Sequence, residues 1–326
     1  MRIHLITPAP SSARGGNWAT AARWARMLRS LGHRVQVTRD YQDEPADLMV
    51  ALHAWRSAEA IARFAAVRPA RPLVVALTGT DAYRFIHSHP QPTLQSLELA
   101  DYLVGLHDLI GETVPAAHRA KLRVIHQSAP PGLARAPLKH RFRICVAGHL
   151  REEKDSLRPA YAVRDLPGHS RLQVEHYGGA HTPDWADAAN TEMQINPRYR
   201  WRGEVPHHRL RRAYAQAHLL ALPSRMEGGA NVISEAVMAD LPVIASRISG
   251  SIGLLGEDYP GYYPVGDAAA LQALLLRAES DQAFYQSLES ACRARRHLFS
   301  LEQEVQAWEE LLRETRYLQK SELRSG

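Results

Sequence analysis

The chain has 326 residues, of which 45% are hydrophobic and 23% are charged, and its formal net charge is +6. This length is sufficient for two domains of ordinary size, and the composition is typical of a soluble globular protein. No apolar run approaches the roughly 18 residues of a membrane span, so stable membrane insertion is not expected. No basic run accompanies a nucleic-acid-binding motif, and the positive charge therefore favours small anionic substrates over nucleic acid.

The two cysteines, Cys145 and Cys292, lack the spacing of a disulfide framework or a zinc site. Met1 leads directly into a predicted strand, which does not resemble a signal peptide. We therefore expect a cytoplasmic protein without a bound metal or cofactor. The sequence does not specify an oligomeric state.

The first part of the chain alternates predicted strands and helices, which indicates a parallel α/β domain. The expected strands are 2–7, 34–38, 47–53, 73–77 and 122–125, the expected helices are 18–31 and 57–67, and residues 94–104 read as a helix followed by a strand. A proline-rich linker at 129–137 follows, so the first domain is placed at residues 1–136.

Two loops of this domain follow strand ends, where ligands of open α/β folds bind. The candidate acceptor-binding residues in these loops are Arg14, Gly15, Gly16, Asn17, Thr80, Asp81 and Arg84. Glycine pairs are common in turns, so the first loop is weak evidence on its own. His53 ends the expected strand at 47–53 and is a candidate catalytic residue. A structural histidine held by hydrogen bonds is an equally good interpretation.

A second α/β domain is placed at residues 137–300, and a helical segment at 301–326 follows it. The expected elements of the second domain and the segment after it are strands at 141–147 and 172–177 and helices at 267–280 and from 282 onward. The loop at 148–155 reads GHLREEKD and, taken alone, is a charged turn exposed to solvent. The pair His207-His208 is interpreted as the surface of a helix start and not as a metal site.

The stretch at 219–246 predicts a strand, a loop with Gly228-Gly229, a helix from about residue 232 and a further strand. Glu227 and Glu235 lie on opposite sides of the glycine pair. A helix N-terminus attracts an anion, and a carboxylate accepts hydrogen bonds from the vicinal hydroxyls of a sugar. The alternative is a solvated helix face that carries two carboxylates.

The motif P-S-x-x-E-G, six residues, then E-A-x-x-A-x-x-P-V-I-A-S resembles the donor-site signature of GT-B glycosyltransferases of the glycogen-synthase-like, family 4 type. The usual G-F-G after the first glutamate is replaced by Gly228-Gly229-Ala230-Asn231. This departure, together with the flanking text SRISGSIGLLGEDYPGYYPVGD, resembles a narrower group, the selenosugar synthases of selenoneine biosynthesis. The resemblance extends over most of the chain.

The resemblance implies two Rossmann-like domains that face each other across a cleft, with a C-terminal helix that crosses back to brace the first domain. It also implies that Glu235 binds the nucleotide ribose, that Glu227 contacts the sugar and that Lys154 holds the donor diphosphate. His149 stands where relatives have an arginine, and Arg151 is the alternative source of that charge. The implied donor-binding residues are Gly148, His149, Arg151, Lys154, Glu227, Gly228, Gly229, Ala230, Asn231 and Glu235, and the candidate catalytic residues are Glu227, Lys154 and His53.

Three functions are open at this point. The first is a selenosugar synthase that joins UDP-N-acetylglucosamine or UDP-glucose to selenophosphate and needs little general-base help, because its selenium nucleophile is already anionic. The second is a conventional transferase acting on a lipid or saccharide hydroxyl, with Trp18 and Trp24 beside Arg23 and Arg26 available for membrane docking. The third is a nucleotide-sugar-binding module without catalysis, which would need a degraded donor site.

Overall fold

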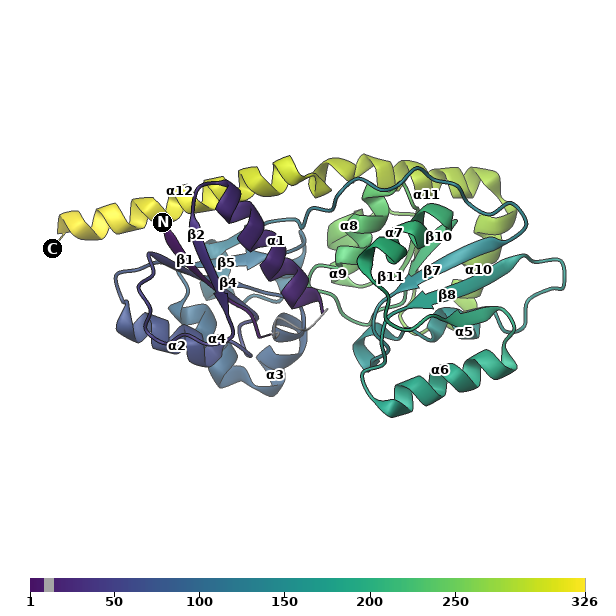
Figure 1. Ribbon diagram of the computed structural model, residues 1–326, viewed down its shortest axis with the longest axis horizontal. Coiled ribbons are helices and arrows are strands. Elements are labelled where there is room, and N and C mark those ends of the chain that lie inside the picture. Colours follow the sequence, from purple (N-terminus) through teal and green to yellow (C-terminus); the bar gives the residue numbers. More distant parts are fainter. Residues whose placement is uncertain (9–14, 326) are drawn as a thin grey trace. The chain divides into compact units, whose positions relative to one another are not determined.

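The computed structural model describes residues 1–8 and 15–325, and the chain divides into two compact units (Figure 1). Unit 1 comprises Met1–Gln127 and Leu301–Gly326, and unit 2 comprises Ser128–Ser300. Each unit contains one six-stranded sheet in which every strand pair is parallel, with helices connecting the strands. The predicted α/β class with two Rossmann-like domains is therefore confirmed.

Unit 1 has the strand order β2-β1-β3-β4-β5-β6. Its strands are β1 (Arg2–Ile6), β2 (Arg34–Thr38), β3 (Leu48–Leu52), β4 (Leu73–Ala76), β5 (Tyr102–Gly105) and β6 (Leu122–Val124). Its helices are α1 (Gly16–Ser30), α2 (Ala58–Val67), α3 (Ile86–Ser88), α4 (Pro90–Leu99) and α12 (Leu301–Ser325), with a π-helical turn η1 (Asp81–Phe85) and 3-10 turns η2 (Ile110–Glu112) and η3 (Ala116–Lys121). β3 and β4 are wholly buried because helices cover both faces of the sheet.

The C-terminal helix α12 packs on α1 within unit 1. The ring of Trp308 meets the ring of Trp24 edge-on at 4.8 Å, and both side chains are fully buried. The Trp24 indole N–H donates to Glu304 Oε1 at 2.8 Å, and Arg23 pairs with the same carboxylate. Trp24 is thus a core residue, which corrects the alternative that it serves as a membrane contact.

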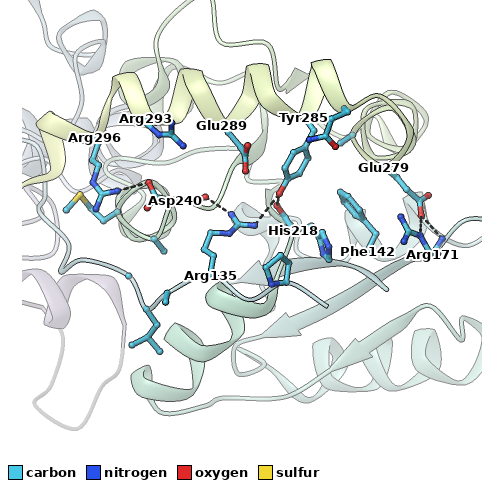
Figure 2. A pocket seen from close by; sticks show the side chains of 18 residues that line it. Arg135, Phe142, Arg171, His218, Asp240, Glu279, Tyr285, Glu289, Arg293 and Arg296 are labelled. Atoms are coloured by element: carbon cyan, nitrogen blue, oxygen red, sulfur yellow. Dashed lines mark hydrogen bonds and ion pairs between the residues drawn. The ribbon is translucent and has the colours of Figure 1, made fainter. Parts of the chain in front are cut away.

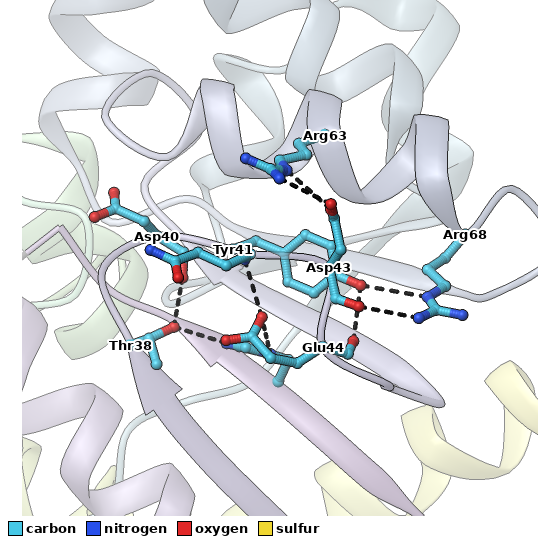
Figure 3. Close-up of polar contacts among 9 residues, drawn as sticks. Thr38, Asp40, Tyr41, Asp43, Glu44, Arg63 and Arg68 are labelled. Carbon is cyan, nitrogen blue, oxygen red and sulfur yellow. Dashed lines mark hydrogen bonds and ion pairs between the residues drawn. The ribbon is translucent and has the colours of Figure 1, made fainter.

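The loop that follows the edge strand β2 is held by a dense set of polar contacts (Figure 3). Asp43, in the left-handed backbone region at φ 64°, accepts two hydrogen bonds of 2.8 Å from Arg63 on α2. The buried Tyr41 donates to the carbonyl of Glu44 at 2.9 Å, and Arg68 donates to the carbonyl of Asp43. The hydrogen bonds from Arg63 and Arg68 hold this loop against α2.

Unit 2 has the strand order β12-β11-β10-β7-β8-β9. Its strands are β7 (Phe142–Ala147), β8 (Leu172–Tyr177), β9 (Tyr199–Trp201), β10 (Leu219–Leu222), β11 (Val243–Ser246) and β12 (Tyr262–Tyr263). Its helices are α5 (Arg158–Ala162), α6 (Pro183–Ile195), α7 (His207–Gln216), α8 (Asn231–Met238), α9 (Ser249–Leu255), α10 (Ala268–Ser280) and α11 (Gln282–Ala294), with 3-10 turns η4 (Glu152–Lys154) and η5 (Arg296–Phe299). Because β7 and β10 are neighbours, the loops that leave their carboxyl ends lie side by side.

The proline-rich linker packs on unit 2. Gly132 donates its N–H to the carbonyl of Met238 at 2.9 Å, and a Cβ on Gly132 would lie 2.3 Å from Cα of Ala239. The change of unit therefore comes after Gln127, ahead of the predicted boundary at residue 136. Among the described residues, no helix combines the length and the hydropathy that crossing a bilayer requires.

Candidate active site

The loops after β7 and β10 bring two predicted site residues into direct contact. Lys154 Nζ donates to Glu227 Oε1 at 2.5 Å, and Ser224 Oγ donates to the same oxygen at 2.5 Å. The Glu227 side chain is 7% exposed and that of Lys154 is 19% exposed. The N–H of Arg225 also donates to the carbonyl of Glu153, which ties the two loops together. A buried carboxylate requires such partners, and Lys154 compensates its charge.

The start of α9 lies against the same loop. A Cβ on Gly250 would lie 2.2 Å from the carbonyl oxygen of Glu227 and 2.9 Å from its Cβ. Ser246, at the end of β11, donates its hydroxyl to the carbonyl of Ser224. The backbone around Glu227 is therefore fixed from two sides, and only glycine at position 250 permits this approach.

The helix α8 begins directly after the glycine pair. Its N-cap residue, Ala230, provides no capping side chain, and the first turn of the helix contains no carboxylate. Gly228 and Ala230 are buried, whereas Gly229 and Asn231 are half-buried. The positive end of this helix suits an anion such as a diphosphate.

Glu235, on the same helix, has partners different from those of Glu227. Tyr214 donates its hydroxyl to Glu235 Oε2 at 3.0 Å, and His207 Nε2 donates to Oε1 at 3.3 Å. The hydrogen bond to this carboxylate raises the pKa of His207, and burial raises the pKa of Tyr214. The interpretation of His207 as simple helix-start surface is therefore incomplete, because its exposed ring contacts a predicted donor-site residue.

His149 and Arg151 differ in the charge that they offer to a diphosphate. His149 Nδ1 accepts from the N–H of Gly179 at 3.1 Å, and burial lowers the pKa of this histidine, so the neutral ring carries its proton on Nε2. Arg151 Nε is buried and has no hydrogen-bond partner in the part of the chain that the structure describes, and it lies 4.0 Å from Glu153 Oε2 in an ion pair. Of the two, Arg151 offers the permanent charge.

The loops of unit 1 hold His53 and Thr80 together. His53 has φ 74°, its Nδ1 accepts from the N–H of Arg56 at 3.1 Å, and its Nε2 lies 3.0 Å from Thr80 Oγ1. Burial lowers the pKa of His53, so the neutral ring donates from Nε2 to the threonine. These two contacts support the interpretation of His53 as a structural histidine held by hydrogen bonds.

Asp81 supports these loops from beneath. It is fully buried, and its carboxylate accepts from the N–H groups of Ala54, Thr78 and Gly79 at 2.8–3.2 Å. This geometry makes it a brace for the loops after β3 and β4 and leaves no face open to an acceptor. The neighbouring Arg84 is exposed on η1, with its guanidinium 5.8 Å from the ring centre of Phe85.

The other predicted acceptor residues lie at the start of α1. Gly15 is its N-cap, and Gly16 and Asn17 form its first turn. A Cβ on either glycine would meet nothing within 4 Å. Arg14 lies outside the described residues.

Three polar residues at the carboxyl edge of unit 1 were not predicted. His107, after β5, is fully buried and 2.8 Å from the Tyr83 hydroxyl, and burial lowers its pKa to about 4. His126, after β6, lies 3.0 Å from Asp108 Oδ1. Both histidines follow strand ends, as His53 does, so the rule that selected His53 would have found them if applied to β5 and β6.

A cavity of about 820 Å³ lies in unit 2 between the linker and α11, away from the residues described above (Figure 2). Phe142 and His218 on its floor are at the amino ends of β7 and β10, whereas the Lys154–Glu227 pair follows the carboxyl ends. Arg135 donates to the carbonyls of Asp240 and Ala217, and Arg296 pairs with the Asp240 carboxylate. The contacts of Arg135 hold the linker on unit 2, and the cavity is separate from the Lys154–Glu227 pair.

Within residues 1–8 and 15–316, no three His, Cys, Asp or Glu side chains are grouped so that they could hold a metal ion. Both cysteines are buried and free, and burial raises the pKa of Cys292 to about 11.

The family model "Glycosyl transferases group 1" matches residues 135–295. No curated protein sequence matches the chain. HepE from Anabaena in complex with UDP has a similar structure, with 16% identity, a TM-score of 0.77 and coverage of 96% of this chain and 99% of that one. Sucrose-phosphate synthase from Thermosynechococcus elongatus is also similar, at 18% identity, a TM-score of 0.76 and coverage of 96% and 98%.

These comparisons support a GT-B glycosyltransferase. At such identities the structural likeness shows the fold alone, and it confirms the predicted GT-B class. The family match at 135–295 includes Lys154, Glu227 and Glu235.

Proposed function

We propose that this glycosyltransferase is a selenosugar synthase that uses UDP-N-acetylglucosamine or UDP-glucose and selenophosphate and releases UDP and phosphate. The choice of a nucleotide-sugar donor is supported chiefly by the buried Lys154–Glu227 pair. This pair lies beside the start of α8, whose N-cap residue provides no capping side chain. Structures of HepE with UDP, with UDP and glucose, and with UDP-glucose support a UDP-sugar donor by analogy. The selenophosphate half rests on the resemblance of residues 227–267 to selenosugar synthases.

Each donor group has a role in this proposal. Glu235 accepts hydrogen bonds from the ribose hydroxyls, and the N-terminal turn of α8 receives the diphosphate. Lys154 and Arg151 balance the negative charge that develops on the departing UDP, and His149 contributes one N–H donor. Glu227 holds both Lys154 and the sugar in position.

The reaction proceeds in two balanced steps. The selenium lone pair of selenophosphate forms a bond to the anomeric carbon while the bond from that carbon to the UDP oxygen breaks, and UDP leaves with the electron pair. Water then cleaves the phosphorus–selenium bond and gives orthophosphate and the selenol of the sugar. The nucleophile is anionic from the start, so charge compensation matters more than a general base.

One residue of the text that resembles the narrower group lies against the loop that carries Glu227. Gly250 belongs to the flanking text of that group, and its lack of a side chain admits the carbonyl of Glu227. On the acceptor side we propose Gly15, Gly16, Asn17, Thr80 and Arg84 as contacts, with His53 orienting Thr80 through its Nε2.

UDP release by the purified protein with a panel of UDP-sugars, in the presence and absence of selenophosphate, tests the proposal. The expected result is UDP release that requires selenophosphate and one preferred UDP-sugar. Release that ignores selenophosphate and requires a lipid or saccharide hydroxyl would exclude the proposal.

That second outcome describes the alternative, a conventional transferase acting on a hydroxyl. The specific observation in its favour is the pair of His126 and Asp108 at the carboxyl edge of unit 1. A histidine beside a carboxylate is suited to remove a proton from a hydroxyl acceptor, which selenophosphate does not require.

We further propose that the reaction needs no metal and takes place in the cytoplasm. The basic side chains and helix start provide the electrostatic compensation that a metal provides elsewhere. Two buried free thiols fit a reducing compartment.

A further inference from the structure

We propose that His207 and Tyr214 are positioning residues that hold the Glu235 carboxylate for the nucleotide, and that His207 makes nucleotide affinity depend on pH. This inference rests on the proposed function in one respect, the assignment of Glu235 to nucleotide binding. His207, Arg211 and Tyr214 occupy positions i, i+4 and i+7 of α7, so they share one face of that helix.

The two hydrogen bonds use different oxygens of Glu235. Tyr214, which is 1% exposed, donates to Oε2, and His207 donates to Oε1. Each carboxylate oxygen accepts two hydrogen bonds, so one site on each oxygen remains for vicinal hydroxyls. The two contacts therefore set the orientation of the carboxylate and leave it able to accept further hydrogen bonds.

The side of Glu235 that faces the linker has no room for a ligand. Pro130, Gly132 and Ala239 close it, and the space that remains is about 10 Å³, the size of one water molecule at most. Arg211 donates to the carbonyl of Pro131 at 2.7 Å and fixes α7 to the linker. The Glu235 side chain is 21% exposed, so a nucleotide reaches it from the other side.

The charged and titratable groups around Glu235 are few. α7 contributes His207, Arg211 and Tyr214, and β7 contributes the buried Cys145. Burial raises the pKa values of Tyr214 and Cys145, so both stay neutral near pH 7. His207 is the group that changes charge, and its hydrogen bond to Glu235 raises its pKa above 6.5.

The sign of the pH effect follows. Below its raised pKa, the cationic His207 makes a charge-assisted hydrogen bond to Glu235 and attracts the anionic nucleotide, and both effects are lost as the pH rises through that pKa. The His207 side chain is 54% exposed, so solvent screening limits the effect to roughly two- to fivefold in affinity.

Calorimetric titration of the full-length protein with UDP between pH 5.5 and 8.5 tests the inference. His207→Gln keeps a donor but cannot titrate, Tyr214→Phe keeps the buried ring, and His208→Gln is the matched control on the next residue. Because a terminal phosphate titrates near pH 6, the readout is the ratio of variant to wild-type affinity at each pH.

We expect His207→Gln to bind UDP roughly two- to fivefold more weakly at pH 6 and to approach wild type at pH 8.5. Tyr214→Phe is expected to bind about tenfold more weakly throughout the range, and His208→Gln to match wild type. A role of His207 in stability alone would not produce a pH-dependent ratio. In ring NMR spectra, Glu235→Gln is expected to lower the pKa of His207.

Two negative results are distinguishable. If wild type binds UDP but His207→Gln and Tyr214→Phe match it at every pH, the positioning role is wrong and the donor assignment stands. If wild type does not bind UDP, the donor assignment itself fails and the inference fails with it. An unchanged pKa of His207 in Glu235→Gln would show that the two residues do not form the ion pair, and this measurement needs no nucleotide.

Discussion

Glu227 receives two short hydrogen bonds on one oxygen, from Lys154 and from Ser224. Glu235 is held by a separate pair of donors from α7. The two carboxylates therefore respond to different partners, and their replacement is expected to affect different steps.

We predict that Glu235→Ala weakens UDP-sugar binding and that Glu227→Ala mainly slows sugar transfer. Each loses a charge-assisted contact of roughly 1.5–3 kcal/mol, which corresponds to about ten- to a hundredfold. Steady-state kinetics separate the KM effect from the kcat effect, with the exposed Glu152→Ala as control. Wild-type turnover in a folded Glu227 or Glu235 variant would remove the donor-site assignment.

On the acceptor side, we predict that replacing Arg84 or Arg14 with alanine raises the KM for selenophosphate more than the KM for the UDP-sugar. Either cation balances a small dianion, and rising ionic strength is expected to have the same effect in milder form. Exposed Arg212 provides a matched arginine-to-alanine control in unit 2. Equal increases in both KM values would contradict a specific acceptor role.

At the scale of elements, the start of α9 and the loop with Glu227 depend on a single glycine. We predict that Gly250→Ala lowers kcat/KM for the UDP-sugar about tenfold or more, because the added Cβ would lie 2.2 Å from the Glu227 carbonyl and must displace the loop. Gly168→Ala is the matched control in unit 2, since a Cβ there meets nothing within 4 Å. Equal activity of the two variants would show that the loop tolerates the displacement.

The packing of α12 on α1 gives a prediction about stability. Trp308→Ala is expected to lower the free energy of unfolding by about 3–5 kcal/mol, because a fully buried aromatic ring leaves a cavity beside Trp24. Leu301→Ala on the same helix is the control, since Leu301 is 53% exposed. Denaturant unfolding measures both, and a loss below about 1 kcal/mol for Trp308→Ala would mean that α12 contributes little to unit 1.

At the scale of the whole molecule, the sequence predicted the elements better than the partners of individual side chains. Short apolar runs between glycines and prolines located β1, β3, β4, β7 and β10, because strands buried on both faces are continuous and apolar. The motifs assigned Lys154 and Glu227 to the same site, but their direct contact across 73 residues of sequence was not predicted.

Other features depend on three-dimensional packing that a linear pattern does not encode. Asp81 follows a strand end like a ligand-binding residue, yet its burial beneath two loops makes it a brace. His207 reaches Glu235 only because α7 packs beside α8. The linker is proline-rich like a domain boundary, yet Gly132 fits against Ala239 and joins it to unit 2.

For the whole molecule, we also predict full activity in excess chelator, because Lys154, Arg151 and the start of α8 provide the charge compensation in the proposed reaction. Turnover is measured before and after treatment with the chelator, and with a divalent ion added back. A loss of activity that the ion restores would contradict the metal-independent mechanism.

The central claim is the formation of a carbon–selenium bond, and product analysis tests it most directly. Mass spectrometry of the reaction with selenophosphate and a UDP-hexose is expected to show a sugar with the isotope pattern of selenium, together with equal amounts of UDP and orthophosphate. A glycosylated hydroxyl compound without selenium, formed with UDP but without orthophosphate, would contradict the claim and establish a conventional glycosyltransferase.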